Sequence, residues 1–203
     1  REGITNMLSP QHALSRVTAP AALPITLAEV KAQMRVEHED DDVIIQRLIE
    51  AAVAFVDVQN VLGKAMITQT WAQWMGPTQG IVLLMLGQVQ SVTAIKYYDV
   101  DGVLQTATLS DFNIFGTSTK TTVSPKNGAS WPVAQQREDA IKIEYVIGYG
   151  DTAADVPQTI RQALMMLVAH WYENREGAQE RALTDVPFGF NELIGIERGQ
   201  FYG

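Results

Sequence analysis

The side chains best suited to chemistry lie in IRQALMMLVAHWYENRE, residues 160–176. His170 and Glu173 are three positions apart, so a helix would place an imidazole and a carboxylate on one face. Such a pair could bind a metal or transfer protons. Di-metal helical bundles, however, use the order Glu-x-x-His together with further glutamates on other helices. Here the order is reversed and no partner set is apparent, so we interpret the segment as a packing helix with a charged end.

Two acidic segments could be mistaken for metal sites. VEHEDDD, residues 36–42, surrounds His38 with carboxylates but lacks the fixed spacing and the glycine of a calcium loop. DVDG, residues 99–102, resembles the opening of such a loop, yet no glutamate follows at the required distance. We interpret the first segment as a solvated helix start and the second as a hairpin turn.

Other catalytic patterns are absent from the sequence. It contains no Gly-x-Ser-x-Gly turn, no glycine-rich phosphate loop and no cysteine, which excludes disulfides and thiol catalysis. The three histidines, His12, His38 and His170, have no recognisable catalytic neighbours. We predict no catalytic, cofactor-binding or metal-binding residue and no cofactor.

The four tryptophans, Trp71, Trp74, Trp131 and Trp171, could serve as stacking platforms for nucleic acid or sugar. We interpret them instead as core or interface residues, and we expect Trp71 and Trp131 to belong to a small β unit. A net charge of −8, with the 15 basic residues scattered singly, offers no basic patch for a phosphate backbone.

The apolar fraction of 46% is enough for a core in a chain of 203 residues. No run approaches the roughly 20 apolar residues that span a bilayer, so no membrane association is predicted. The first residues lack the apolar stretch of a signal peptide. We expect residues 1–23 to form a flexible or extended arm that becomes ordered against a partner.

Apolar periodicity predicts three main helices. The first, about 27–36, begins with a capping box between Thr26 and Glu29. The second, about 41–61, follows acidic residues that favour a helix N-terminus, and Gly63 is suited to its end. The third is the segment 156–177, with Pro157 near its first turn and Gly177 at its end.

Between these helices, residues 66–150 change to an alternating pattern and predict five to seven short strands. The segment 178–203 carries apolar residues without any sustained period, so we predict an extended docking tail. The expected fold class is α+β: a small antiparallel helix bundle of three main helices, 24–65 and 156–177, with a β-rich insert between the second and third helices.

Two signatures in this order resemble the head–tail connector, or adaptor, proteins of tailed bacteriophages. The first runs from ITLAEVKAQMRVEHEDDD to the exit GKAMITQTW, residues 63–71. The second is VPQTIRQALMMLVAHWYENRE, residues 156–176, and DVPFGFNELI is similar to the family's tail. The resemblance covers residues 24–195.

The resemblance implies a ring of identical subunits, expected to be a dodecamer, located at the head–tail junction of a virion assembled in the bacterial cytoplasm. Its expected partners are the portal protein, further copies of itself, and a downstream connector or tail protein. DNA would pass through the channel without sequence-specific binding. The expected portal or partner contacts are Pro187, Phe188, Phe190, Leu193, Ile194, Phe201 and Tyr202.

The resemblance also gives a structural signature: Trp71, Trp171, Tyr172, Glu173 and Arg175. We expect Trp171 to anchor its helix in the core, and Tyr172, Glu173 and Arg175 to contact the rest of the subunit or a neighbouring copy. Two alternatives remain open. One is another head-closure or tail-completion protein, distinguished by its partner, and the other is an enzyme or ligand-binding domain with a site in the β insert.

Overall fold

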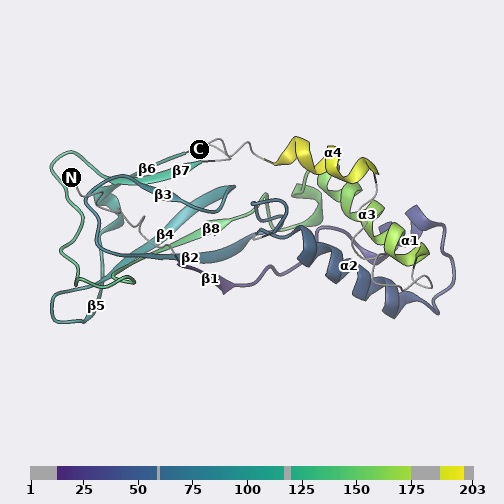
Figure 1. The fold of residues 1–203 in the computed structure, drawn as a ribbon, viewed down its shortest axis with the longest axis horizontal. Helices are drawn as coiled ribbons and strands as arrows, with labels where there is room; N and C mark the ends of the chain where they lie inside the picture. Colours follow the sequence, from purple (N-terminus) through teal and green to yellow (C-terminus); the bar gives the residue numbers. More distant parts are fainter. Residues whose placement is uncertain (1–12, 59, 117–119, 175–187, 199–203) are drawn as a thin grey trace, which may run out of the picture. The chain divides into compact units, whose positions relative to one another are not determined.

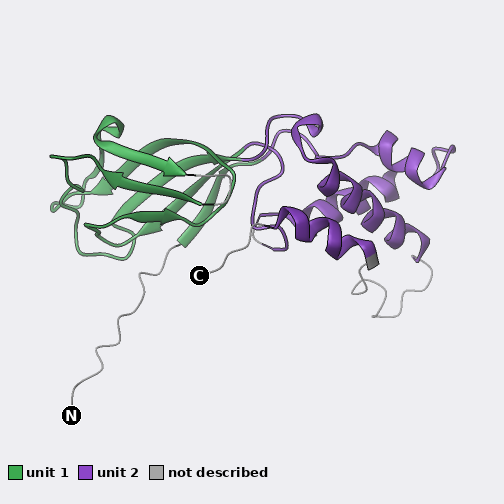
Figure 2. Ribbon diagram, turned by 90° about the horizontal axis from the view of Figure 1, so that it is seen from above, with its two compact units in different colours: residues 1–19, 69–147 green, residues 20–68, 148–203 purple. Residues whose placement is uncertain are grey.

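The computed structural model describes residues 13–58, 60–116, 120–174 and 188–198. These residues form four α-helices and eight strands arranged in two antiparallel sheets (Figure 1). The chain divides into two compact units: residues 1–19 with 69–147, and residues 20–68 with 148–203 (Figure 2). We call them the β unit and the helical unit.

The helical unit contains α1 (Leu27–Met34), α2 (Asp42–Val56), α3 (Gln158–Glu173) and α4 (Phe188–Glu197). Helix α1 begins as predicted, with Thr26 and Glu29 forming a reciprocal capping box. Helix α2 ends at Val56, earlier than predicted, because Asp57 is already extended. Gly63 does adopt a positive φ of 67°, but it lies in the connection that follows rather than at the helix end.

One apolar core holds the helical unit together. It draws buried side chains from all four helices and from the segments around Leu62 and Val156. Helix α3 contributes most of them, at the helical spacing that the sequence predicted: Ile160, Ala163, Leu164, Met165, Leu167, Val168 and Trp171.

The β unit contains two sheets. The five-stranded sheet has the order β1 (Ala13–Thr18), β2 (Gln69–Met75), β8 (Ile141–Ile147), β4 (Val89–Tyr98) and β5 (Leu104–Thr106). The three-stranded sheet has the order β3 (Val82–Leu84), β7 (Thr121–Pro125) and β6 (Phe112–Gly116). Strand β8 is central and alternates buried and half-buried residues, as its sequence predicted.

Buried Gln73 connects the two sheets. Its Nε2 donates to the carbonyl of Leu83 at 3.0 Å, and its Oε1 accepts from the amide of Met85 at 2.9 Å. The side chain of a β2 residue thereby satisfies backbone groups at the edge of β3, where a neighbouring strand would otherwise be needed.

The predicted fold, a three-helix bundle carrying a β insert and ending in an extended tail, is wrong. The described residues hold a fourth helix and two sheets, and Ala13–Thr18 of the expected arm forms β1, paired antiparallel with β2. The tail is helical over Phe188–Glu197 because Phe190 and Ile194, four residues apart, are both buried in the core. Tertiary packing outweighs the weak helical preference of a segment that contains two glycines.

Candidate assembly surfaces

An aromatic cluster connects three helices of the helical unit. Trp171 is buried, and its ring meets Phe55 of α2 edge-on with centroids 6.1 Å apart. Phe55 also contacts Phe190 of α4 at 6.4 Å. Phe55 therefore joins three helices, and edge-to-face geometry adds to the stabilisation that burial provides.

The polar residues around Trp171 diverge instead of forming a catalytic group. Tyr172 donates from its hydroxyl to Asp41 Oδ2 at 2.6 Å, and Glu173 is exposed. The backbone carbonyl of His170 accepts from Asn174 Nδ2 at 2.7 Å. Arg175, the remaining signature residue, lies outside the described residues.

Helix α4 holds the described part of the predicted portal contact. Phe190 and Ile194 are buried in the helical core, and Leu193 is half-buried against it. Ile196, on the other side of the helix, is 70% exposed. Pro187, Phe201 and Tyr202 lie outside the described residues, as does the side chain of Phe188.

Hydrogen bonds to Glu197 hold the end of α4 against the rest of the helical unit. The sequence did not predict this arrangement. Its carboxylate accepts from Thr159 Oγ1 at 2.8 Å and from the Tyr149 hydroxyl at 3.2 Å. Lys64 Nζ donates to its backbone carbonyl at 2.7 Å, and Arg198 Nε donates to the carbonyl of Val61 at 2.6 Å. Burial and the neighbouring Glu197 raise the pKa of Tyr149 well above its usual value, so this hydroxyl stays a hydrogen-bond donor.

A second polar network fixes α1 against α3. Arg161 pairs with the Glu29 carboxylate and donates from Nε to the carbonyl of Pro24 at 3.2 Å. The capping hydrogen bonds from Thr26, reinforced by Arg161, lower the pKa of Glu29 below its usual value. Lys31 and Asp42 form a further ion pair at 2.5 Å between α1 and α2.

Trp71 and Trp131 of the β unit are packing residues. Trp71 is buried and donates from Nε1 to Gln69 Oε1 at 3.0 Å. Trp131 is buried against Phe112, with ring centroids 4.8 Å apart, and donates to the carbonyl of Gly80 at 2.7 Å. Both side chains are more than nine-tenths buried, which fits a packing role.

The acidic segments do not assemble a metal site in the described part of the chain, where no group of three or more histidines and carboxylates comes together. Asp99 instead organises the predicted hairpin turn. Its Oδ1 accepts from the amides of Asp101 and Val103, at 3.1 and 2.9 Å, and Gly102 has a φ of 79°.

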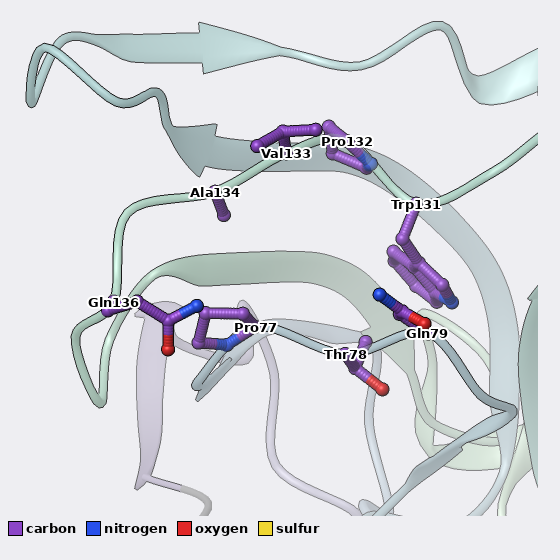
Figure 3. Close-up of a pocket in the computed structure, with 8 residues that line it drawn as sticks. All are labelled: Pro77, Thr78, Gln79, Trp131, Pro132, Val133, Ala134 and Gln136. Atoms are coloured by element: carbon purple, nitrogen blue, oxygen red, sulfur yellow. The ribbon is translucent and has the colours of Figure 1, made fainter.

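A pocket of about 390 Å³ opens beside Trp131 in the β unit (Figure 3). The side chains that line it are apolar or carry neutral hydroxyl and amide groups: Pro77, Thr78, Gln79, Trp131, Pro132, Val133, Ala134 and Gln136. None of them is a general acid or base at neutral pH. This pocket therefore gives no support to an enzymatic site in the β insert.

The net charge is distributed unequally between the two units. The β unit carries seven basic and seven acidic residues, whereas the helical unit carries eight basic and sixteen acidic residues. The entire charge of −8 therefore belongs to the helical unit. Of the described helices, none is long and apolar enough to cross a membrane.

A family model described as "Head completion protein" matches residues 24–184. The chain therefore belongs to the head completion protein family, and the prediction drawn from the two signatures, a relative of phage head–tail connectors, is confirmed. A search of curated proteins gave no match.

Three of the solved structures with a similar fold come from gene transfer agent (GTA) particles. A chain in the "Neck of empty GTA particle computed with C6 symmetry" is 23% identical with a TM-score of 0.73, covering 92% of this chain and 95% of that one. A chain in the "Neck of native GTA particle computed with C12 symmetry" is also 23% identical, with a TM-score of 0.71, covering 92% of this chain and 94% of that one. A chain in the "Virion of native gene transfer agent (GTA) particle" is 22% identical with a TM-score of 0.71, covering 91% of this chain and 94% of that one. At this level of identity the likeness establishes the fold.

Proposed function

We propose that the chain is a non-enzymatic structural protein of the virion neck that forms an adaptor ring between the capsid portal and the next connector or tail protein. The observation that carries this proposal is the fold shared, over nearly the whole of both chains, with a component of a neck whose structure was computed with C12 symmetry. By that analogy the ring contains twelve copies and surrounds the channel through which DNA passes.

The charge distribution supports a ring that guides DNA without binding it. A neck protein that gripped the phosphate backbone would need a concentrated basic surface. The basic residues of this chain are scattered singly along its sequence, and its helical unit carries the whole net charge of −8. Phosphates would be repelled by such a unit, which favours sliding of DNA over binding.

The proposed portal contact is the set expected from the sequence: Pro187, Phe188, Phe190, Leu193, Ile194, Phe201 and Tyr202. The described members of this set pack against the helical core, so direct contact from α4 would come from its outward side. Phe190 and Ile194 hold α4 on its own subunit, and the outward side of the helix, which includes Ile196, is available to a partner. The structural signature Trp71, Trp171, Tyr172, Glu173 and Arg175 would shape the subunit for assembly.

Ordered addition tests this function against the alternative of a later head-closure or tail-completion protein. Purified chain is mixed with portal assemblies alone, or with portal assemblies already loaded with candidate neck proteins, and co-sedimentation is measured. An adaptor binds the bare portal. Binding only after another neck protein has been added would favour the alternative and reject the adaptor role.

A further inference from the structure

The β unit contains an uncharged stretch that still reaches the surface. No Asp, Glu, Lys or Arg occurs between Lys64 and Lys96. Ile81, Leu83 and Met85 within this stretch nevertheless have exposed side chains, and Ile81 is 73% exposed. Alternating exposed apolar residues in a stretch of sequence without charges are unusual for a solvated strand and typical of an interaction surface.

Strand register extends this surface across the three-stranded sheet. Leu83 pairs with Thr122, and Thr122 pairs with Phe115, so the three side chains lie in one row on one face of the sheet. Phe115 is 78% exposed, whereas Val82 and Val123 on the opposite face are buried. We call Ile81, Leu83, Met85 and Phe115 the sheet patch.

Two lysines border the sheet patch. Lys120 and Lys126 lie at the two ends of β7, the central strand of this sheet, and both are exposed. Neither forms an ion pair with any residue that the structure describes. The sheet patch thus combines exposed apolar side chains with positive charge.

A second patch with the opposite charge lies on the hairpin between β4 and β5 (Figure 1). Val100, Val103 and Leu104 are all exposed there, and we call them the hairpin patch. Asp101 beside them has no ion-pair partner in the described part of the chain. The hairpin patch thus combines exposed apolar side chains with negative charge.

The hairpin is built to hold its shape without a partner. Asp99 accepts two backbone amides of the turn and the side-chain amide of Gln105, at 2.8 Å for the latter. At the base, the Arg137 guanidinium lies 4.0 Å from the centre of the Tyr98 ring and pairs with Asp139 through two hydrogen bonds. A preorganised hairpin loses little conformational entropy when it binds.

We propose that the hairpin patch of one copy packs on the sheet patch of the next copy, with Asp101 facing Lys120 and Lys126. This inference rests on the proposed ring. A closed ring requires two different, mutually complementary surfaces on every subunit. The β unit supplies two apolar patches, one bordered by positive and the other by negative side chains. Contact through the β unit, whose net charge is zero, also avoids placing helical units of net charge −8 directly against each other.

The absence of native cysteines allows a direct test. Val103→Cys and Phe115→Cys are made as separate variants, mixed, and treated with a short bismaleimide, both alone and after addition of portal. A covalent dimer is expected in the mixture and not in either variant by itself. Val43→Cys, an exposed position on α2 of the helical unit, replaces Phe115→Cys in the matched control and is expected to give no dimer.

Native mass measurement of the same samples separates this contact from the ring itself. Complexes of several copies without the covalent dimer would overturn the hairpin-to-sheet contact and leave the ring standing. Dimers from a single variant would also overturn it, because they indicate a two-fold contact. No self-association with or without portal would reject both the contact and the proposed function.

Charge exchange provides an independent measurement. Asp101→Lys is expected to reduce the yield of multimeric complexes, and adding Lys126→Asp to the same chain is expected to restore part of it. Both residues are exposed, so each variant is expected to fold. Equal yields for all three proteins would contradict the predicted pairing.

Discussion

The hydroxyl of Tyr172 lies 2.6 Å from Asp41 Oδ2, which joins the last turn of α3 to the residue that precedes α2. Through this hydrogen bond a residue of the second sequence signature contacts the acidic segment of the first. The two signatures are 131 positions apart at this point, so their co-occurrence has a structural basis in the helical unit.

Removing the Tyr172 hydroxyl tests the strength of this connection. Tyr172→Phe keeps the ring and leaves the Asp41 carboxylate without that donor, so the helical unit is expected to lose about 1 kcal/mol of unfolding free energy. Urea denaturation followed by far-UV circular dichroism measures the change. An unchanged midpoint would show that water replaces the hydroxyl without loss.

Truncating Trp171 should have a larger effect. Trp171→Ala leaves a cavity between α3 and Phe55, and a loss of about 3–5 kcal/mol is expected. Because so large a loss consumes much of a domain's stability, ring formation is expected to fail as well. A variant that unfolds at the wild-type urea concentration and assembles normally would reject the anchoring role.

The docking of α4 can be tested with two residues on opposite sides of the helix. Phe190→Ala removes a buried ring and is expected to cost about 3–5 kcal/mol, whereas exposed Ile196→Ala should change stability by less than about 0.5 kcal/mol. Portal binding by the folded protein should show the opposite order of effects, with Ile196→Ala weakening binding more than Phe190→Ala. Equal stability losses would mean that α4 does not pack as described.

Acid sensitivity of the helical unit should depend partly on Glu29. Because the folded-state pKa of this carboxylate is lowered by Thr26 and Arg161, its contribution to stability is complete above its ordinary value of 4.5. That contribution is lost as the pH falls through the folded-state pKa. Wild type should therefore be more stable than Glu29→Gln at pH 7, and the difference should shrink under acid conditions.

Melting temperatures of the two proteins at several pH values measure this difference. Glu192→Gln, an exposed position on α4, serves as the control and should follow the wild type throughout. A difference between wild type and Glu29→Gln that stays constant down to the lowest pH would contradict the assigned role of the Glu29 carboxylate.

The sequence predicted best where a local pattern repeats over several turns or strands. The apolar stripe of α3, the capping box at Thr26, the alternation of β8 and the turn at Asp99 all follow from neighbouring residues. Each depends on interactions within a few positions, which periodicity and turn chemistry describe well.

The elements that were missed depend on distant partners. Strand β1 is mostly exposed and shows no clear alternation. It forms through its pairing with β2, whose residues lie 52 to 61 positions further along the chain. Helix α4 contains Gly189 and Gly195, and its stability comes from the burial of Phe190 and Ile194. The four-residue spacing of these two apolar residues was the available signal.

The candidate surfaces likewise include features that follow from local patterns and features that depend on distant residues. Burial of Trp171 was predictable from helical spacing, but the contacts of Glu197 with Thr159 and Tyr149 join residues 38 and 48 positions apart. The exposure of Phe115 could not be predicted from the sequence either, because an aromatic residue in a strand is normally expected in the core. Only the register of β6 with β7 and β3 shows that it shares a face with Leu83.

Native mass spectrometry of the chain, alone and mixed with its portal protein, tests whether it is an adaptor. We expect a complex in which the chain joins the portal in a fixed multiple, twelve copies per portal ring by analogy with the C12 neck. A chain that remains monomeric and never joins the portal, while other neck proteins do, would contradict the adaptor role.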